Sequence, residues 1–121
     1  MINDFVGIPY GFREDAGLDC WQIAIKVLKT EYKKDVPDYH YAGKWNEVEG
    51  KFNECKKDFV KVDKPQKGDI ILFRVCGIVA HCGVVVGDAI MIHTMKGHNS
   101  CVERFTSPKW VNRIEGYYRW L

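Results

Sequence analysis

At residues 80–93 the chain reads AHCGVVVGDAIMIH, two apolar runs that flank the turn-forming pair Gly87-Asp88. Runs of this length, rich in β-branched residues and joined by a short loop with glycine, predict a β-hairpin. Each predicted strand carries one histidine, His81 in the first and His93 in the second. The length of the loop therefore determines whether the two imidazoles share a face of the sheet.

Two pairings of this hairpin are open. A two-residue turn puts His81 and His93 on opposite faces, because successive residues of a strand point to opposite sides. A three-residue loop, residues 87–89, pairs Gly83 with His93 and leaves His81 diagonal to it on the same face. Diagonal neighbours lie about 7–8 Å apart, which lets two imidazoles meet. A contact between the histidines thus requires the odd-length loop, with Gly83 leaving space for it.

Outward from the hairpin, the rest of the chain divides into a helical half and a strand half. Residues 1–18 are rich in glycine and predict an irregular loop. Apolar stripes at helical spacing predict one helix that starts at Cys20 and a second over residues 44–57. After a turn at residues 65–69, further strand-like runs are Ile70–Val75, Cys101–Phe105 and Gly116–Trp120. This order predicts a single α+β domain, residues 1–121, with helices packed on an antiparallel sheet.

Cys20 lies where the N-terminal loop ends and the first helix begins. Asp19 is a favourable N-cap residue, and Gln22 three positions later completes a capping-box pattern. Cys20 is then the first helical residue, where unpaired N–H groups and the helix dipole favour a thiolate. A thiolate beside a histidine is a nucleophile, whereas free cysteines elsewhere are commonly buried small hydrophobes. The pattern predicts a cysteine hydrolase.

Composition and charge exclude several other classes of protein. The 121 residues carry a net charge of +2 and no basic cluster interleaved with aromatics, so we expect no nucleic-acid partner. No stretch approaches the ~20 apolar residues of a membrane span, and the first residues lack the pattern of a secretory signal. We expect synthesis in the cytoplasm without a signal peptide, with a virion or a partner system carrying the protein to any site outside.

The five cysteines do not suggest a disulfide framework. They are an odd set without a CxxC pair: Cys20, Cys55, Cys76, Cys82 and Cys101. We interpret Cys76, Cys82 and Cys101 as core packing residues. The alternative is a metal site, because His81, Cys82, His93, His98 and Cys101 crowd one third of the chain. Structural zinc sites usually show two close ligand pairs, and only His98 with Cys101 offers one, so we expect no metal and no cofactor.

Six short motifs occur in a fixed order along the chain. They are Gly7-Ile8-Pro9-Tyr10-Gly11, Leu18-Asp19-Cys20-Trp21, PQKGDIILF at 65–73, HCGVVVG at 81–87, MIH at 91–93 and YYR at 117–119. In this order and spacing the chain resembles the NlpC-type cell-wall cysteine peptidases over nearly its whole length. The resemblance implies a papain-like fold. Asp19-Cys20-Trp21, with Val36-Pro37-Asp38-Tyr39 after the helix, looks most like the branch found in phage tail-tip assembly proteins.

The resemblance implies roles for the residues already singled out. Cys20 would be the nucleophile, His81 the general base, and His93 the residue that orients His81. The hydroxyl of Tyr10 and the backbone N–H of Cys20 would stabilise the oxyanion, with Asp19 and Trp21 beside them. Each residue also has a structural alternative: His93 as a core histidine, Tyr10 packed against Pro9, and Trp21 as core filling rather than a wall of the substrate pocket.

The substrate implied by the resemblance is a peptidoglycan stem peptide, cut at the γ-D-glutamyl–diaminopimelate bond, and the tail-tip branch would add phage tail proteins as partners. Two other functions stay open. One is a different acyl chemistry on the same fold, by an acyltransferase or another amidase. The other is a catalytically silent structural module of tail assembly. The joint presence of Cys20, His81 and His93 favours an enzyme.

Overall fold

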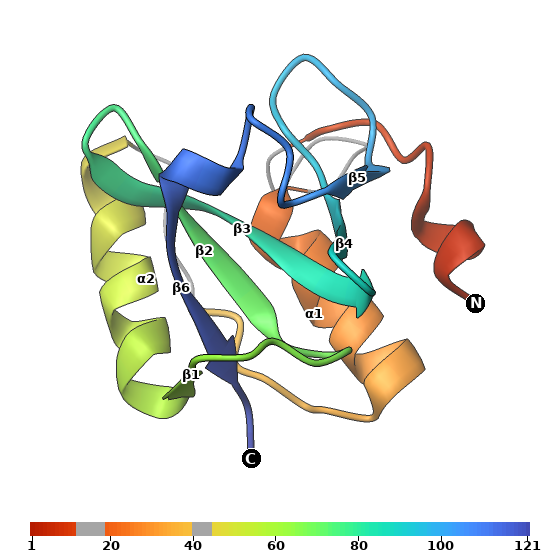
Figure 1. Ribbon diagram of the computed structural model, residues 1–121, viewed down its shortest axis with the longest axis horizontal. Coiled ribbons are helices and arrows are strands. Elements are labelled where there is room, and N and C mark those ends of the chain that lie inside the picture. Colours follow the sequence, from red (N-terminus) through yellow and green to blue (C-terminus); the bar gives the residue numbers. More distant parts are fainter. Residues whose placement is uncertain (12–18, 40–44) are drawn as a thin grey trace.

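The computed structural model describes residues 1–11, 19–39 and 45–121, which form two helices, two short 3-10 helices and six strands (Figure 1). The elements in chain order are η1 (Ile2–Phe5), α1 (Cys20–Tyr32), α2 (Trp45–Asp58), β1 (Val60–Val62), β2 (Ile70–Val75), β3 (Ile78–Gly87), β4 (Ile90–His93), β5 (Cys101–Arg104), η2 (Val111–Arg113) and β6 (Ile114–Arg119). Neither described helix has the length and apolar character that crossing a bilayer requires.

The six strands form one antiparallel sheet in the order β1-β6-β2-β3-β4-β5. The predicted α+β architecture is confirmed, and the predicted helices and strands agree with the observed ones to within a few residues. Three described elements were not predicted: the edge strand β1, the 3-10 helix η1 within the expected N-terminal loop, and the 3-10 helix η2. Residues 12–18 of that loop and residue 44 lie outside the described part of the chain.

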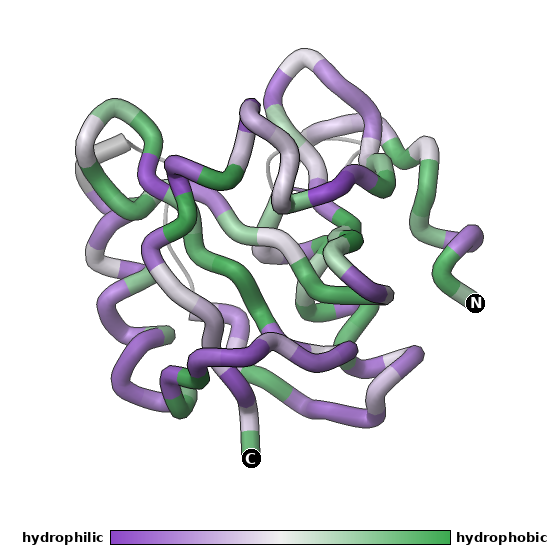
Figure 2. Tube along the Cα trace, in the orientation of Figure 1, coloured by the Kyte–Doolittle hydropathy of each residue, from purple (hydrophilic) through white to green (hydrophobic). Residues whose placement is uncertain are grey.

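Each face of the sheet carries its own apolar core. Both helices pack on one face, where Trp21 and Leu28 of α1 and Phe52 of α2 meet Leu72 and Val84. The opposite face is covered by the chain between β5 and β6, and its buried cluster consists of Ile71, Phe73, Val85, Met91, Phe105 and Trp110. Because β2 is buried on both faces, it is apolar almost throughout, as the continuous green of the central strand shows in Figure 2.

The β3–β4 hairpin has the predicted register but reaches it in a different way. Val84 pairs with Ile92 and Val85 with Met91, so Gly83 lies opposite His93. The turn contains only Asp88 and Ala89, with Ala89 at a positive φ of 56°. A bulge between Val85 and Gly87 supplies the extra residue. The expected three-residue loop was therefore wrong, because Gly87 belongs to the strand and a bulge shifts the register by one residue just as the longer loop would.

A second bulge precedes His81 on the other edge of β3. Phe73 pairs with His81 but Arg74 pairs with Val79, which leaves Ala80 as the extra residue. Val79 packs in the core under the helices, whereas His81 contacts Phe73 and Trp110 on the opposite face. Bulges next to functional sites commonly re-aim a side chain in this manner, and here the bulge sets the direction of His81.

Candidate active site

Cys20 occupies the first position of α1, as the capping pattern predicts. The Asp19 carboxylate accepts a hydrogen bond from the Gln22 backbone N–H at 2.9 Å, and the Gln22 side chain accepts from the Asp19 N–H at 3.0 Å. This reciprocal pair fixes where the helix begins. The Cys20 side chain is half-buried. It belongs to the N-terminal end of the helix, where the first backbone N–H groups have no hydrogen-bond partner within the helix.

The surroundings of Cys20 favour the thiolate. The pKa of its thiol lies well below the ordinary value, and the largest cause is a hydrogen bond from the Cys82 thiol. Burial acts in the opposite direction, while the positive charge of Lys51 and a hydrogen bond with His81 lower the pKa further. Burial and the charge on Cys20 raise the pKa of Cys82, so Cys82 stays protonated. Its Sγ also lies 3.5 Å from the backbone oxygen of Cys20.

The two histidines meet through one ring nitrogen each. His81 Nε2 lies 2.9 Å from His93 Nδ1, and both rings are buried. The predicted diagonal contact across the hairpin is therefore confirmed. Burial, followed by the positive charge of His81, lowers the pKa of His93 to about 4, although Glu103 acts in the opposite direction. His93 is thus neutral near pH 7 and can accept a hydrogen bond from His81.

Two residues that the sequence did not single out complete this cluster. Glu103 of β5 places Oε2 at 2.5 Å from His93 Nε2 and accepts a second hydrogen bond from the Trp110 indole at 3.1 Å. Trp110 is fully buried and stacks on His81, with ring centroids 5.4 Å apart and planes at 22°. Its ring also meets that of His93 edge-on at 5.0 Å. The cluster therefore extends from α1 through β3 and β4 to β5.

Tyr10 lies close enough to Cys20 and Asp19 to interact with their charges. Burial is the largest cause that raises the pKa of Tyr10 to about 12, and Cys20 and Asp19 add to it. The phenol therefore remains a hydrogen-bond donor. The segment before it is fixed by Ser100, whose hydroxyl donates to the Phe5 carbonyl at 2.5 Å and accepts from the Ile8 N–H at 2.9 Å. These hydrogen bonds hold the N-terminal segment that precedes Tyr10 against the connection between β4 and β5.

Trp21 belongs to the core and has no exposed surface. Its indole N–H donates to the Pro37 carbonyl at 2.9 Å, and its ring contacts those of Tyr39, Phe52 and Phe59. Of the two interpretations of Trp21, the burial supports core filling rather than a wall of an open pocket. Asp19 is likewise almost fully buried and acts here as the helix cap.

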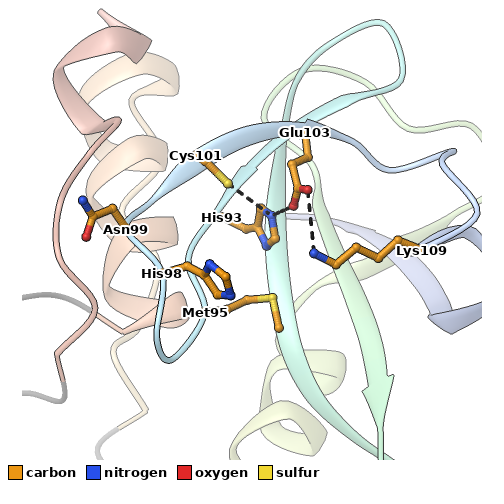
Figure 3. A pocket seen from close by; sticks show the side chains of 7 residues that line it. All are labelled: His93, Met95, His98, Asn99, Cys101, Glu103 and Lys109. Carbon is orange, nitrogen blue, oxygen red and sulfur yellow. Dashed lines mark hydrogen bonds and ion pairs between the residues drawn. The ribbon is translucent and has the colours of Figure 1, made fainter.

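A cavity of about 190 Å³ lies beside His93, between β4, β5, the connection between these two strands and the segment that follows β5 (Figure 3). His93, Cys101 and Glu103 line it and place one donor atom each within 4.8 Å of one another. Cys101 Sγ is 3.8 Å from His93 Nε2. The 2.5 Å between His93 Nε2 and Glu103 Oε2 is a hydrogen-bond separation. Two ligand atoms that each lie about 2.0–2.2 Å from a zinc ion stand farther apart than this.

The model of the NlpC/P60 family matches residues 7–119. The chain belongs to the NlpC/P60 family. The predicted resemblance to the NlpC-type proteins is thus confirmed at the level of the family. No curated protein sequence matches the chain closely enough to count as a relative.

Solved structures show the same fold at low sequence identity. An NlpC/P60 family protein from Bacillus cereus superposes with a TM-score of 0.73 at 24% identity, over 98% of this chain and 37% of that one. A lipoprotein-like NLP/P60 protein from Staphylococcus aureus gives 0.67 at 16%, over 96% and 37%. The NlpC/p60 domain of the peptidoglycan hydrolase SagA gives 0.63 at 18%, over 96% and 90%. The chain thus spans little more than a third of the first two proteins.

Proposed function

We propose that this protein is a cysteine peptidase that hydrolyses an amide bond of peptidoglycan stem peptides, with Cys20, His81 and His93 as the catalytic residues. The observation that carries the proposal is the position of Cys20. Its thiol stands at the start of α1 with a lowered pKa and a hydrogen bond to His81, and His81 is bonded in turn to His93.

In the acylation step the Cys20 sulfur attacks the amide carbonyl and forms a C–S bond while the carbonyl oxygen takes the negative charge. Because Nε2 of His81 faces His93, Nδ1 is the nitrogen that serves Cys20. When the C–N bond breaks, His81 transfers its proton to the leaving amine. Water then attacks the thioester, His81 accepts a proton from it, and the sulfur leaves as thiolate.

The negative charge on the carbonyl oxygen needs donors that are already in place. The backbone N–H of Cys20 is available because the first N–H groups of a helix have no partner within it. The Tyr10 hydroxyl is the second donor that we assign, since its raised pKa keeps the proton on the phenol beside Cys20. Asp19 contributes indirectly, by holding the first turn of α1 in place.

For the substrate, we propose the γ-D-glutamyl–diaminopimelate bond, and a tail-associated phage or prophage protein as the setting. The choice of bond rests on the resemblance to the NlpC-type family as a whole. The tail-associated setting rests on the motifs Asp19-Cys20-Trp21 and Val36-Pro37-Asp38-Tyr39. Phage tail proteins would then be the partners that bring the enzyme to the cell wall. An acyltransferase or another amidase would use the same thioester, and a silent assembly module would use none.

The experiment is digestion of purified peptidoglycan and of a synthetic L-Ala-γ-D-Glu-diaminopimelate peptide, followed by mass spectrometry. We expect cleavage between D-Glu and diaminopimelate by the wild type and none by Cys20→Ala. Cleavage at another amide would correct the bond, and amide exchange with an added amine would indicate an acyltransferase. A folded wild type that cleaves nothing and forms no thioester would contradict the proposal and favour the structural module.

A further inference from the structure

We infer that Glu103 is a positioning residue of this site, which keeps the His93 proton on Nε2 so that His93 Nδ1 can accept from His81. The inference rests on the proposed function, since it concerns how the Cys20–His81 pair is kept in its reactive form. Glu103 lies outside the three residues assigned above and does not touch Cys20.

The geometry of the sheet brings Glu103 to His93. In the β4–β5 pairing, His93 lies opposite Cys101 and Met91 lies opposite Glu103. Glu103 is therefore diagonal to His93 on the same face, the same relation that His81 has to His93 across β3 and β4. His93 is thus held between two diagonal neighbours. Figure 3 shows the Glu103 carboxylate pointing at the ring, and the Oε2 to Nε2 distance is 2.5 Å.

The ionised carboxylate of Glu103 can only accept a hydrogen bond. This fixes which nitrogen of His93 carries the proton, and so the direction of the hydrogen bond between His93 and His81. Burial raises the pKa of Glu103, but hydrogen bonds and charges from His93, Lys109 and Trp110 outweigh it and lower the pKa overall. Nε2 of His93 must then carry the proton, and its Nδ1 must accept. His81 consequently donates through Nε2, which is the proton arrangement of an imidazolium paired with the Cys20 thiolate.

Glu103 is itself held by neighbours that contact the same histidines. The Trp110 indole donates to Oε2 at 3.1 Å, and the Lys109 ammonium lies 3.9 Å from Oε1. Because Trp110 also stacks on His81, one buried side chain fixes both the carboxylate and the general base. This shared support is typical of groups that preorganise a reactive residue.

Without Glu103, His93 is free to place its proton on Nδ1, where it would face the proton of the His81 imidazolium. The imidazolium would lose its acceptor, and the thiolate would lose its partner. In the Ser-His-Asp proteases, replacing the orienting carboxylate costs about 10⁴ in rate. Glu103 acts one residue farther from the nucleophile, so we expect a smaller loss in kcat, about 10- to 100-fold.

The test compares Glu103→Gln and Glu103→Ala with the wild type, and uses Glu49→Gln on the exposed side of α2 as a matched control. The first readout is the rate of Cys20 alkylation by iodoacetamide against pH, which needs no substrate. We expect the apparent Cys20 pKa to rise toward the ordinary thiol value of about 8.5 in both Glu103 variants and to stay in place in the control. With substrate, kcat should fall while KM changes little.

Chemical rescue separates positioning from folding. Glu103→Ala joins the vacated space to the cavity that Lys109 lines, so formate can enter and accept from His93 Nε2. We expect formate, against chloride at equal ionic strength, to restore alkylation below pH 7 in Glu103→Ala only. An unchanged alkylation profile in Glu103→Gln would overturn the inference, as would failure of formate to restore Glu103→Ala. If the wild type has a reactive Cys20 but cleaves no peptidoglycan, the proposed substrate fails and this inference stands.

Discussion

The close packing of Gly83 against the strand that carries His93 leads to a specific prediction about stability. A Cβ added at this position would lie 2.8 Å from the sulfur of Met91 and 3.5 Å from the Cβ of His93. The first distance is far inside van der Waals contact, and Met91 is fully buried among the apolar residues of its face. Gly83→Ala must therefore displace the Met91 side chain by roughly an ångström into a packed core.

The expected cost of this displacement is about 1–3 kcal/mol, the usual range for an overpacked core. Urea denaturation followed by circular dichroism measures it. With a slope of about 2 kcal/mol per molar, the unfolding midpoint should fall by about 0.5–1.5 M. If Gly83→Ala changes the free energy of unfolding by less than about 0.5 kcal/mol, Gly83 does not lie against Met91 as described.

A double-mutant cycle assigns the cost to this one contact. Met91→Ala alone should destabilise by about 2–5 kcal/mol, because it leaves a cavity. In that background the new methyl group of Gly83→Ala has room, so its own cost should largely disappear. We expect a coupling energy of at least about 1 kcal/mol between the two substitutions. Strictly additive effects would contradict the assigned packing and, with it, the register that brings His93 beside His81.

Further predictions concern the cap, the N-terminal segment, acid stability and metals. Asp19→Ala should cost about 1 kcal/mol of stability and Asp19→Asn much less, measured by urea denaturation, because asparagine also caps helices. Ser100→Ala should cost about 1–3 kcal/mol, since the Ile8 N–H loses its acceptor; an unchanged midpoint would contradict the clamp. The pKa of His93 is lowered to about 4, so the unfolded chain binds its proton first as pH falls below about 6.5. Stability should therefore drop between about pH 6.5 and 4, by up to about 3 kcal/mol, and His93→Gln should flatten this dependence. A chelator should leave Cys20 alkylation and peptidase activity unchanged; a loss of either would indicate a metal at His93.

Features set by neighbouring residues along the chain could be predicted from the sequence. The Asp19 and Gln22 side chains cap α1 through contacts three residues apart, so the start of the helix and the place of Cys20 follow from local spacing. The alternation of the strands reduced the hairpin to two pairings, and the structure has the one that places His81 and His93 on a shared face. The bulges at Ala80 and Val86 could not be predicted, because each depends on how β3 pairs with a neighbouring strand rather than on the local sequence pattern.

The outer part of the site depends on contacts that no local pattern reveals. Glu103 reaches His93 only because β5 pairs with β4 in a particular register, and residues 94–100 between them are irregular. The sequence predicted a strand at residues 101–105. Placing that strand beside His93 was the step that could have indicated Glu103. Trp110 lies in a loop, where spacing carries no information about burial. The interpretation of Cys82 as a core packing residue agrees with its complete burial. Its hydrogen bond with Cys20 is in addition the largest cause of the lowered pKa of the Cys20 thiol.

Cys20 is proposed to be a thiolate paired with the imidazolium of His81. The experiment that tests this pairing is alkylation by iodoacetamide as a function of pH, in the wild type and in His81→Ala, resolved by peptide mass spectrometry. The interpretation of Cys76 as a core residue was wrong, because its side chain is exposed, and it serves as the accessible reference cysteine within the same chain. The buried Cys55 should react slowly. We predict that Cys20 reacts far faster than Cys76 below pH 7 in the wild type, and that this advantage shrinks in His81→Ala. A Cys20 that titrates like an ordinary thiol near pH ~8.5, or that is equally reactive without His81, would contradict this pairing.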